Sequence, residues 1–186
     1  MLVNNAGFGS VGVFDDADVD RMLAMVRLNI TSLTELTYRV LPSMLERKHG
    51  AVINVSSVAA MQPVAYMPVY AASKAFVLHF SEALWAELRD RGVTVMALCP
   101  GTTETEFFDV AGVPGWLKKH SGQSARDVVR RALKALDKRR SYVVTGWWNY
   151  LLSLGARFAP RRMVVMQTLS HFRATPKQSE KEKAEE

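Results

Sequence analysis

The sequence predicts an α/β protein built around a parallel β-sheet. Two apolar runs, 51–55 and 93–98, have the nearly unbroken hydrophobic character of strands that are covered on both faces. Longer segments with apolar residues at helical spacing alternate with these runs. A chain of 186 residues with 48% apolar content is also long enough to enclose one sizeable core.

The first element is a short strand at residues 2–3 that leads into the turn Asn4-Asn5-Ala6-Gly7. Small residues in such a turn let the backbone come close to a ligand. Acidic residues at 15–20 then supply the first turn of a helix. We expect this helix to continue to about Leu41, because apolar residues recur at Met22, Leu23, Val26 and Ile30.

Asn29 lies on or near the apolar face of this helix. A buried amide without partners would cost about 1–3 kcal/mol, so the side chain should be hydrogen-bonded. Pro42 is expected in the last turns of the helix, and the basic residues and glycine of 47–50 are typical of a helix C-terminus.

The strand 51–55 ends at two serines, Ser56 and Ser57. The carboxyl ends of parallel strands are where open α/β sheets bind ligands, so these hydroxyls are candidates for chemistry. The following loop, 59–69, is too apolar for a solvated loop, and we expect it to form one wall of a substrate pocket.

Tyr70 and Lys74 lie four residues apart at the start of a helix expected to run to about Arg91, so they share one helix face. A cation beside a phenolate favours ionisation and should lower the phenol pKa from roughly 10, which suits proton transfer. Tyr66 is a competing candidate but lacks a lysine four residues on. The wide apolar stripe of the helix suits packing on the sheet and against a second subunit.

The strand 93–98 leads to a Pro100-Gly101 turn followed by the hydroxyls of Thr103 and Thr105. Exposed amides and hydroxyls after such a turn suit hydrogen bonding to a carboxamide or to phosphates. Residues 107–121 are expected to form a substrate loop with hinge-like glycines, in which Trp116 caps the pocket. A helix capped by Ser124 and a last strand at 142–145 complete the order.

Residues 146–162 contain an aromatic cluster, a leucine run and basic residues, but the apolar stretch is too short to span a bilayer. This segment suits contact with a membrane surface, and the alternative is that it covers the substrate pocket or a dimer interface. Residues 174–186 are rich in Lys, Glu, Gln and Ser and are expected to be a disordered charged tail.

The net charge of +6 comes from one region, because residues 113–173 carry 13 basic and 2 acidic residues. An anionic membrane surface or an acyl-carrier substrate fits this block, whereas no nucleic-acid-binding motif accompanies it. The single cysteine, Cys99, excludes an internal disulfide and a cysteine metal cluster, and we expect it to be buried. Residues 1–4 do not resemble a signal peptide, so we expect a cytoplasmic protein, with membrane association through 146–162 as the alternative.

Over about residues 1–145, the sequence resembles the classical short-chain dehydrogenase/reductase family in the order and spacing of five motifs. These are Asn-Asn-Ala-Gly, the helical asparagine, strand-Ser-Ser, Tyr-x-x-x-Lys and Pro-Gly-x-x-x-Thr. The resemblance implies a Rossmann-like doubly wound parallel sheet, no catalytic metal, and hydride transfer between a ketone or 3-oxoacyl group and a secondary alcohol with NADP or NAD. It assigns catalysis to Asn29, Ser57, Tyr70 and Lys74. It assigns cofactor contacts to Asn5, Ala6, Gly7, Tyr70, Lys74, Pro100, Gly101, Thr103 and Thr105.

The implied roles are specific. Tyr70 exchanges the proton, Lys74 lowers its pKa and contacts the ribose, Ser57 hydrogen-bonds the carbonyl oxygen, and the backbone carbonyl of Asn29 holds a relay water. Within the family, the sequence most resembles reductases of long 3-oxoacyl chains and steroids. The likeness is in residues 41–47, the Met-x-Pro-Val sequence at 61–64 and the extended C-terminus. The family also implies a homo-oligomer.

The family opens with a strand and a Gly-rich turn, Thr-Gly-x-x-x-Gly-x-Gly, that seats the cofactor pyrophosphate, and this sequence does not contain that turn. We therefore expect the fold to lack its first βαβαβ half, with 1–145 as the remaining part of the Rossmann domain and 146–173 as an extension. The residue that selects NAD or NADP belongs to the missing half. The alternative is a catalytically silent remnant that binds full-length relatives.

Overall fold

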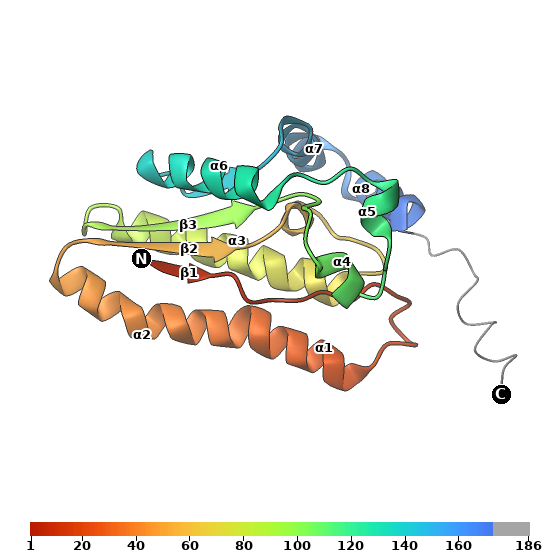
Figure 1. The fold of residues 1–186 in the computed structure, drawn as a ribbon, viewed down its shortest axis with the longest axis horizontal. Helices are drawn as coiled ribbons and strands as arrows, with labels where there is room; N and C mark the ends of the chain where they lie inside the picture. The colour runs from red at the N-terminus through yellow and green to blue at the C-terminus, as the bar shows by residue number, and fades with distance from the viewer. Residues whose placement is uncertain (173–186) are drawn as a thin grey trace, which may run out of the picture.

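The computed structural model describes residues 1–172 and contains one parallel sheet of four strands in the order β1-β2-β3-β4 (Figure 1). All three pairings are parallel, and Val52 lies opposite Leu2 on one side and Val95 on the other. The predicted parallel sheet is therefore confirmed. The strands are β1 (Leu2–Asn4), β2 (Gly50–Val55), β3 (Val93–Cys99) and β4 (Tyr142–Val144).

Helices cover both faces of the sheet, as Figure 1 shows with α2 (Leu33–Glu46) below it and α6 (Ala125–Asp137) above it. Alternate strand residues point to opposite faces. Val52 packs in a core cluster with Met44 and Leu88, while Ile53 packs with Val128 of α6. Both faces of the sheet are thus buried, which confirms the doubly wound arrangement and explains the unbroken apolar runs.

The first long helix is continuous but not uniform. It consists of α1 (Val19–Val26), a π-helical segment η1 (Arg27–Ser32) and α2, and the Asp18 side chain caps its start by accepting from the backbone N–H groups of residues 20 and 21. The helix contains Pro42 near its end and stops at Glu46, just before the basic residues and glycine of 47–50, as predicted, although the apolar periodicity had indicated an end at about Leu41. The sequence did not predict the π-helical segment, which places Asn29 at its centre.

The helix that contains Tyr70 and Lys74 differs from the prediction at both ends, since it also ends at Leu88 and not at about Arg91. Helix α3 (Pro68–Leu88) begins two residues before Tyr70, because a proline suits the first turn of a helix. The loop before it contains a 3₁₀ segment, η2 (Val58–Met61), which the Ser57 side chain caps. Tyr70 and Lys74 consequently lie in the first two turns of α3, where neighbouring elements hold them firmly.

The region from 107 to 121, which was expected to be a substrate loop, is partly helical. It contains two single-turn helices, α4 (Phe107–Val110) and α5 (Trp116–Lys119), because Phe108, Trp116 and His120 stack in succession. Ser124 caps α6 as predicted. Beyond β4 the chain forms α7 (Trp147–Phe158) and α8 (Arg161–Phe172), and the tail predicted at 174–186 lies outside the described residues.

A ladder of buried amides and hydroxyls crosses the sheet. Asn4 donates to Thr37 on α2 and to Asn54 on β2, at 3.0 and 2.8 Å, and Asn54 donates to Ser81 on α3 at 2.9 Å. Sequence reasoning missed this network, because nothing local links residues 27 to 50 positions apart. The ladder fixes β1 against β2 and both against the helices, which sets the position of the turn after β1.

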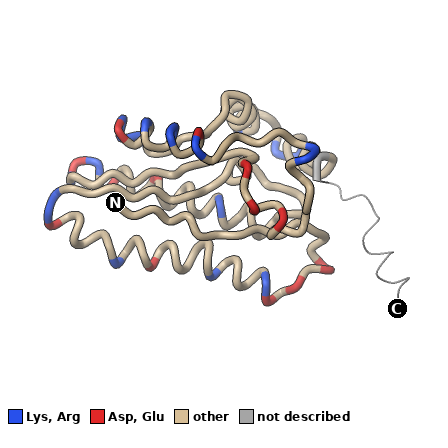
Figure 2. The backbone as a smooth tube through the Cα atoms, in the orientation of Figure 1, with Lys and Arg blue, Asp and Glu red and all other residues tan. Residues whose placement is uncertain are grey.

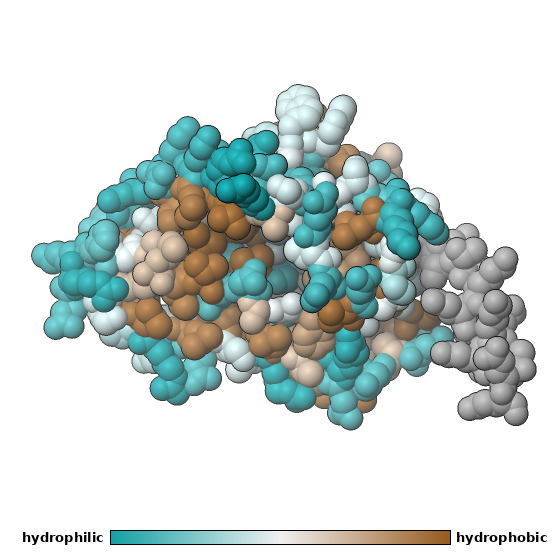
Figure 3. All heavy atoms as spheres, in the orientation of Figure 1, coloured by the Kyte–Doolittle hydropathy of each residue, from teal (hydrophilic) through white to brown (hydrophobic). Residues whose placement is uncertain are grey.

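Strand β1 lies at the edge of the sheet and pairs with β2 alone among the described strands. Figure 3 shows hydrophobic side chains gathered on this face below the hydrophilic residues of α6. The exposed apolar residues of these elements include Val3, Val129 and Leu133. Within residues 1–172, no helix has both the length and the hydropathy needed to cross a bilayer.

Candidate active site

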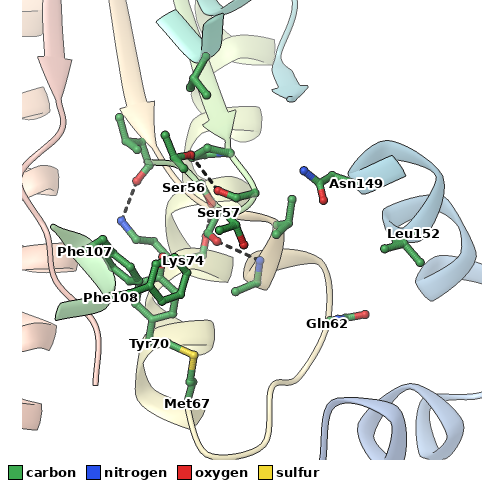
Figure 4. A pocket seen from close by; sticks show the side chains of 18 of the residues that line it. Ser56, Ser57, Gln62, Met67, Tyr70, Lys74, Phe107, Phe108, Asn149 and Leu152 are labelled. Atoms are coloured by element: carbon green, nitrogen blue, oxygen red, sulfur yellow. Dashed lines mark hydrogen bonds between the residues drawn. The ribbon is translucent and has the colours of Figure 1, made fainter. Parts of the chain in front are cut away.

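The structure brings the two predicted hydroxyl groups together. Ser57 follows β2 and is held by the cap of η2, in which its Oγ accepts from the Ala59 N–H at 3.1 Å. Tyr70 projects from the first turn of α3, and its hydroxyl shares a hydrogen bond with the Ser57 side chain. Figure 4 shows Ser57, Tyr70 and Lys74 converging on one pocket. An oxygen bound between the two hydroxyls could accept a hydrogen bond from each.

Lys74 is 5% exposed, and its Nζ donates to the Val55 carbonyl at 2.8 Å. It lies 5.8 Å from the centroid of the Tyr70 ring. Burial lowers the pKa of Lys74 to about 8, because the charged form loses its hydration. The ammonium is therefore anchored to the end of β2, beside the tyrosine ring.

The predicted lowering of the Tyr70 pKa is wrong for this structure. Burial raises the pKa of Tyr70 to about 12, and the hydrogen bond from Ser57 only partly opposes this effect. The physical reason is that desolvation penalises the phenolate, while the Lys74 ammonium is engaged with the Val55 carbonyl. Tyr70 is consequently a protonated phenol near neutral pH.

Asn29 is buried, as predicted, and its side chain is fully engaged. Its Nδ2 donates to the Phe8 carbonyl at 3.0 Å and to Ser73 Oγ at 3.1 Å, and its Oδ1 accepts from the Phe8 N–H at 3.3 Å. Ser73 in turn donates to the Tyr70 carbonyl at 2.8 Å. Asn29 therefore ties the turn after β1 to the first turns of α3. Whether its backbone carbonyl holds a relay water stays a prediction.

Gly7 is required by this close approach. A Cβ at Gly7 would come within 2.8 Å of Asn29 Oδ1 and 3.3 Å of Lys74 Nζ, so a side chain there would push the two elements apart.

Ser56 has a structural role, since its Oγ donates to the Lys74 carbonyl at 2.7 Å. Cys99 is buried, as predicted, and burial raises the pKa of its thiol to about 12.

Ser57, Tyr70 and Lys74 all line a cavity of about 1300 Å³. Of the residues that the resemblance assigned to the cofactor, only Ala6, which is exposed, does not line the cavity. The others do, and they are Asn5, Gly7, Tyr70, Lys74, Pro100, Gly101, Thr103 and Thr105. The loop before α3 also contributes, through Gln62 and Met67, as predicted for a pocket wall.

The opposite wall comes from α7 and α8, which Figure 4 shows across the pocket from Ser57 and Tyr70. Asn149, Leu151 and Leu152 of α7 line it, together with Val164 of α8. Thr168 of α8 fastens this wall to the loop before α3 by accepting from the Ala65 N–H at 3.2 Å. The segment from 146 thus covers the cavity, which the sequence had left as an alternative to membrane contact.

The residues present fit one end of a nicotinamide nucleotide. Backbone and hydroxyl groups after β1 and β3 meet the Tyr70 and Lys74 side chains in the cavity, the set that a ribose and carboxamide require. The Asn149 amide lies directly on Gly101, where a Cβ would collide with it, and donates to the Thr145 carbonyl at 2.8 Å. The Gly-rich turn that would bind the pyrophosphate is not in this sequence.

Comparison with known proteins agrees with this geometry. The family model described as short chain dehydrogenase matches residues 1–112. The very-long-chain 3-oxoacyl-CoA reductase of Anas platyrhynchos is 37% identical over 115 residues, which are 60% of this chain and 37% of that protein. Hydroxysteroid dehydrogenase-like protein 1 of Gallus gallus is 30% identical over 161 residues, 84% of this chain and 48% of that protein.

Among solved structures, a short-chain dehydrogenase from Sphingobium yanoikuyae in complex with NADPH superposes with a TM-score of 0.74 and 32% identity. The match covers 84% of this chain and 62% of that one. This chain thus spans less than half the length of the two curated relatives named above. The matched segment contains Asn29, Ser57, Tyr70 and Lys74, and the chain belongs to the short-chain dehydrogenase family.

Proposed function

We propose that the chain carries the catalytic residues of an NAD(P)-dependent oxidoreductase that interconverts a ketone or 3-oxoacyl group and a secondary alcohol. The observation that carries this proposal is the convergence of the Ser57, Tyr70 and Lys74 side chains on one large cavity (Figure 4). When bound, the nicotinamide would supply or accept the hydride. The protein groups described above hold the carbonyl oxygen and move the proton.

Tyr70 is protonated near neutral pH, which is the state that a proton donor in ketone reduction needs. Ser57 donates to the carbonyl oxygen, a role for which the loss of one donor costs about 3 kcal/mol of transition-state stabilisation. Lys74, with a pKa of about 8, is mainly cationic at pH 7 and lies beside the Tyr70 ring.

A long acyl chain or a steroid is the substrate class we favour. The cavity of about 1300 Å³ has leucines 151 and 152, Val164 and Met67 along its walls, which suits an extended apolar group. The names of two relatives, a very-long-chain 3-oxoacyl-CoA reductase and a hydroxysteroid dehydrogenase-like protein, support the same class.

The test uses a fusion of this chain to the N-terminal half of the Sphingobium yanoikuyae dehydrogenase, which supplies a complete cofactor site. NADPH oxidation is followed with a long-chain 3-oxoacyl-CoA. Tyr70→Phe should reduce turnover about 10²–10⁴-fold with little change in NADPH affinity. Tyr66→Phe is the matched control, because Tyr66 does not line the cavity. Retention of more than about a tenth of the activity by Tyr70→Phe would exclude Tyr70 as the proton donor.

A second candidate function, binding of relatives or of a second copy, has its own support. Among the described strands, β1 pairs on one side only, and α2 and α3 expose Leu36, Tyr38 and Phe76. A free edge and an exposed apolar surface both favour association. We propose a homodimer through α2 and α3, and light scattering tests it. If the chain is monomeric at all concentrations and does not associate with a full-length relative, the dimer proposal is wrong and the oxidoreductase proposal is unaffected.

A further inference from the structure

A second cavity, of about 370 Å³, lies between α6 and α7, and we call it the α6–α7 groove. Its basic wall is formed by Arg131 and Lys134 of α6 and by Lys138 and Arg140, which follow α6, and its aromatic wall by Trp147 and Tyr150 of α7. The residues of α7 that face the active-site cavity, such as Leu152, project from the other side of the same helix. One helix therefore separates the groove from the active site.

The charge of the groove is uncompensated. Across residues 1–172, none of its four cations forms an ion pair, and none of the lining residues is acidic. Figure 2 shows the basic residues along α6. The helix dipole would account for cations in the last turn of α6, but Arg131 lies before that turn. Four cations around one small cavity indicate an anionic ligand.

The remaining lining narrows the kind of anion. Trp147 and Tyr150 are 64% and 44% exposed, so their rings are available for stacking. Aromatic rings beside arginine and lysine are the combination that binds a nucleotide, with the base on a ring and the phosphates on the cations. Gly146, which lines the groove, precedes the first turn of α7. Because no side chain within the described residues caps that turn, its backbone N–H groups are available to an anion in the groove.

We propose that the α6–α7 groove binds the phosphorylated nucleotide end of a coenzyme A thioester whose acyl chain occupies the active-site cavity. This inference rests on the proposed function for the acyl part. The two openings approach each other at the first turn of α7, where Gly146 lines the groove and Asn149 lines the cavity. A helix is about 10 Å wide, which is shorter than the extended pantetheine arm that would connect the two sites.

Calorimetric titration of the purified 186-residue chain with free coenzyme A tests the groove without any turnover. Lys134→Glu/Lys138→Glu should weaken binding about tenfold or more, because it replaces two charge-assisted contacts with repulsion. Lys118→Glu/Lys119→Glu on α5 is the matched control, since it makes the same change of net charge outside the groove. The control should bind as the native chain does, and dephospho-coenzyme A should bind more weakly than coenzyme A.

Equal affinity of the native chain and Lys134→Glu/Lys138→Glu, or no binding of coenzyme A to the native chain, would overturn the proposal. Binding of inorganic phosphate with the same affinity as coenzyme A would reject the nucleotide. If phosphatidic acid vesicles bind through these lysines while coenzyme A does not, the groove is a lipid headgroup site and the proposal is also wrong. Coenzyme A binding that depends on the groove in a Tyr70→Phe chain would support the groove even if the proposed reaction fails.

Discussion

Replacing Asn29 with leucine should separate the turn after β1 from the start of α3. Leucine has a similar shape and fills the same buried space, but it can neither donate nor accept a hydrogen bond. The three bonds lost are those to the Phe8 N–H, the Phe8 carbonyl and Ser73 Oγ, at 3.0–3.3 Å. The substitution thus tests the hydrogen bonds with little effect from a cavity.

The magnitude follows from the number of bonds. Each buried hydrogen bond contributes about 0.5–1.5 kcal/mol, and groups left without a partner cost more, so we expect the free energy of unfolding to fall by about 2–4 kcal/mol. Urea unfolding followed by tryptophan fluorescence measures this change at constant m-value. Asn5→Ala is the control, because the Asn5 side chain is exposed, and it should change stability by less than about 0.5 kcal/mol.

A loss below about 1 kcal/mol for Asn29→Leu would refute the reasoning, since it would mean that Phe8 and Ser73 find other partners. A changed m-value would instead indicate that the substitution alters the compactness of the folded or unfolded chain. In the fusion described above, the same variant should lower turnover more than it lowers NADPH affinity, because the start of α3 holds Tyr70.

Four further predictions concern pH, the cofactor and membranes. The native chain should gain stability relative to Lys74→Met as the pH rises from about 8 to 10.5, because the folded-state pKa of about 8 lies below the ordinary 10.5, and a flat difference in urea unfolding would contradict this. Relative to Tyr70→Phe it should lose stability from pH 10 to about 12, since that folded-state pKa is raised. The 186 residues alone should bind NADPH and NADH only weakly by calorimetry, because the sequence contains no Gly-rich pyrophosphate turn, and micromolar binding would contradict this. Flotation with anionic vesicles at low salt should be lost in Trp147→Ala/Trp148→Ala, and no flotation of the native chain would exclude the membrane role.

The sequence by itself determined the features that depend on local order. Strands β2 and β3 were predictable because both of their faces are apolar, and the Asp18 and Ser124 caps follow from side-chain chemistry close to the helix starts. The spacing of Tyr70 and Lys74 placed both on one helix face, and the position of Ser57 after a buried strand placed it at the edge where parallel sheets bind ligands.

Only the tertiary structure decided what those residues touch. Lys74 meets the Val55 carbonyl and Asn29 meets Phe8 and Ser73, and these partners are 19 to 44 positions away. The direction of the Tyr70 pKa depends on how completely other segments exclude water, which spacing along one helix does not reveal. The α6–α7 groove likewise exists because α6 and α7 both pack against β4, so burial and proximity between distant segments set the chemistry of both sites.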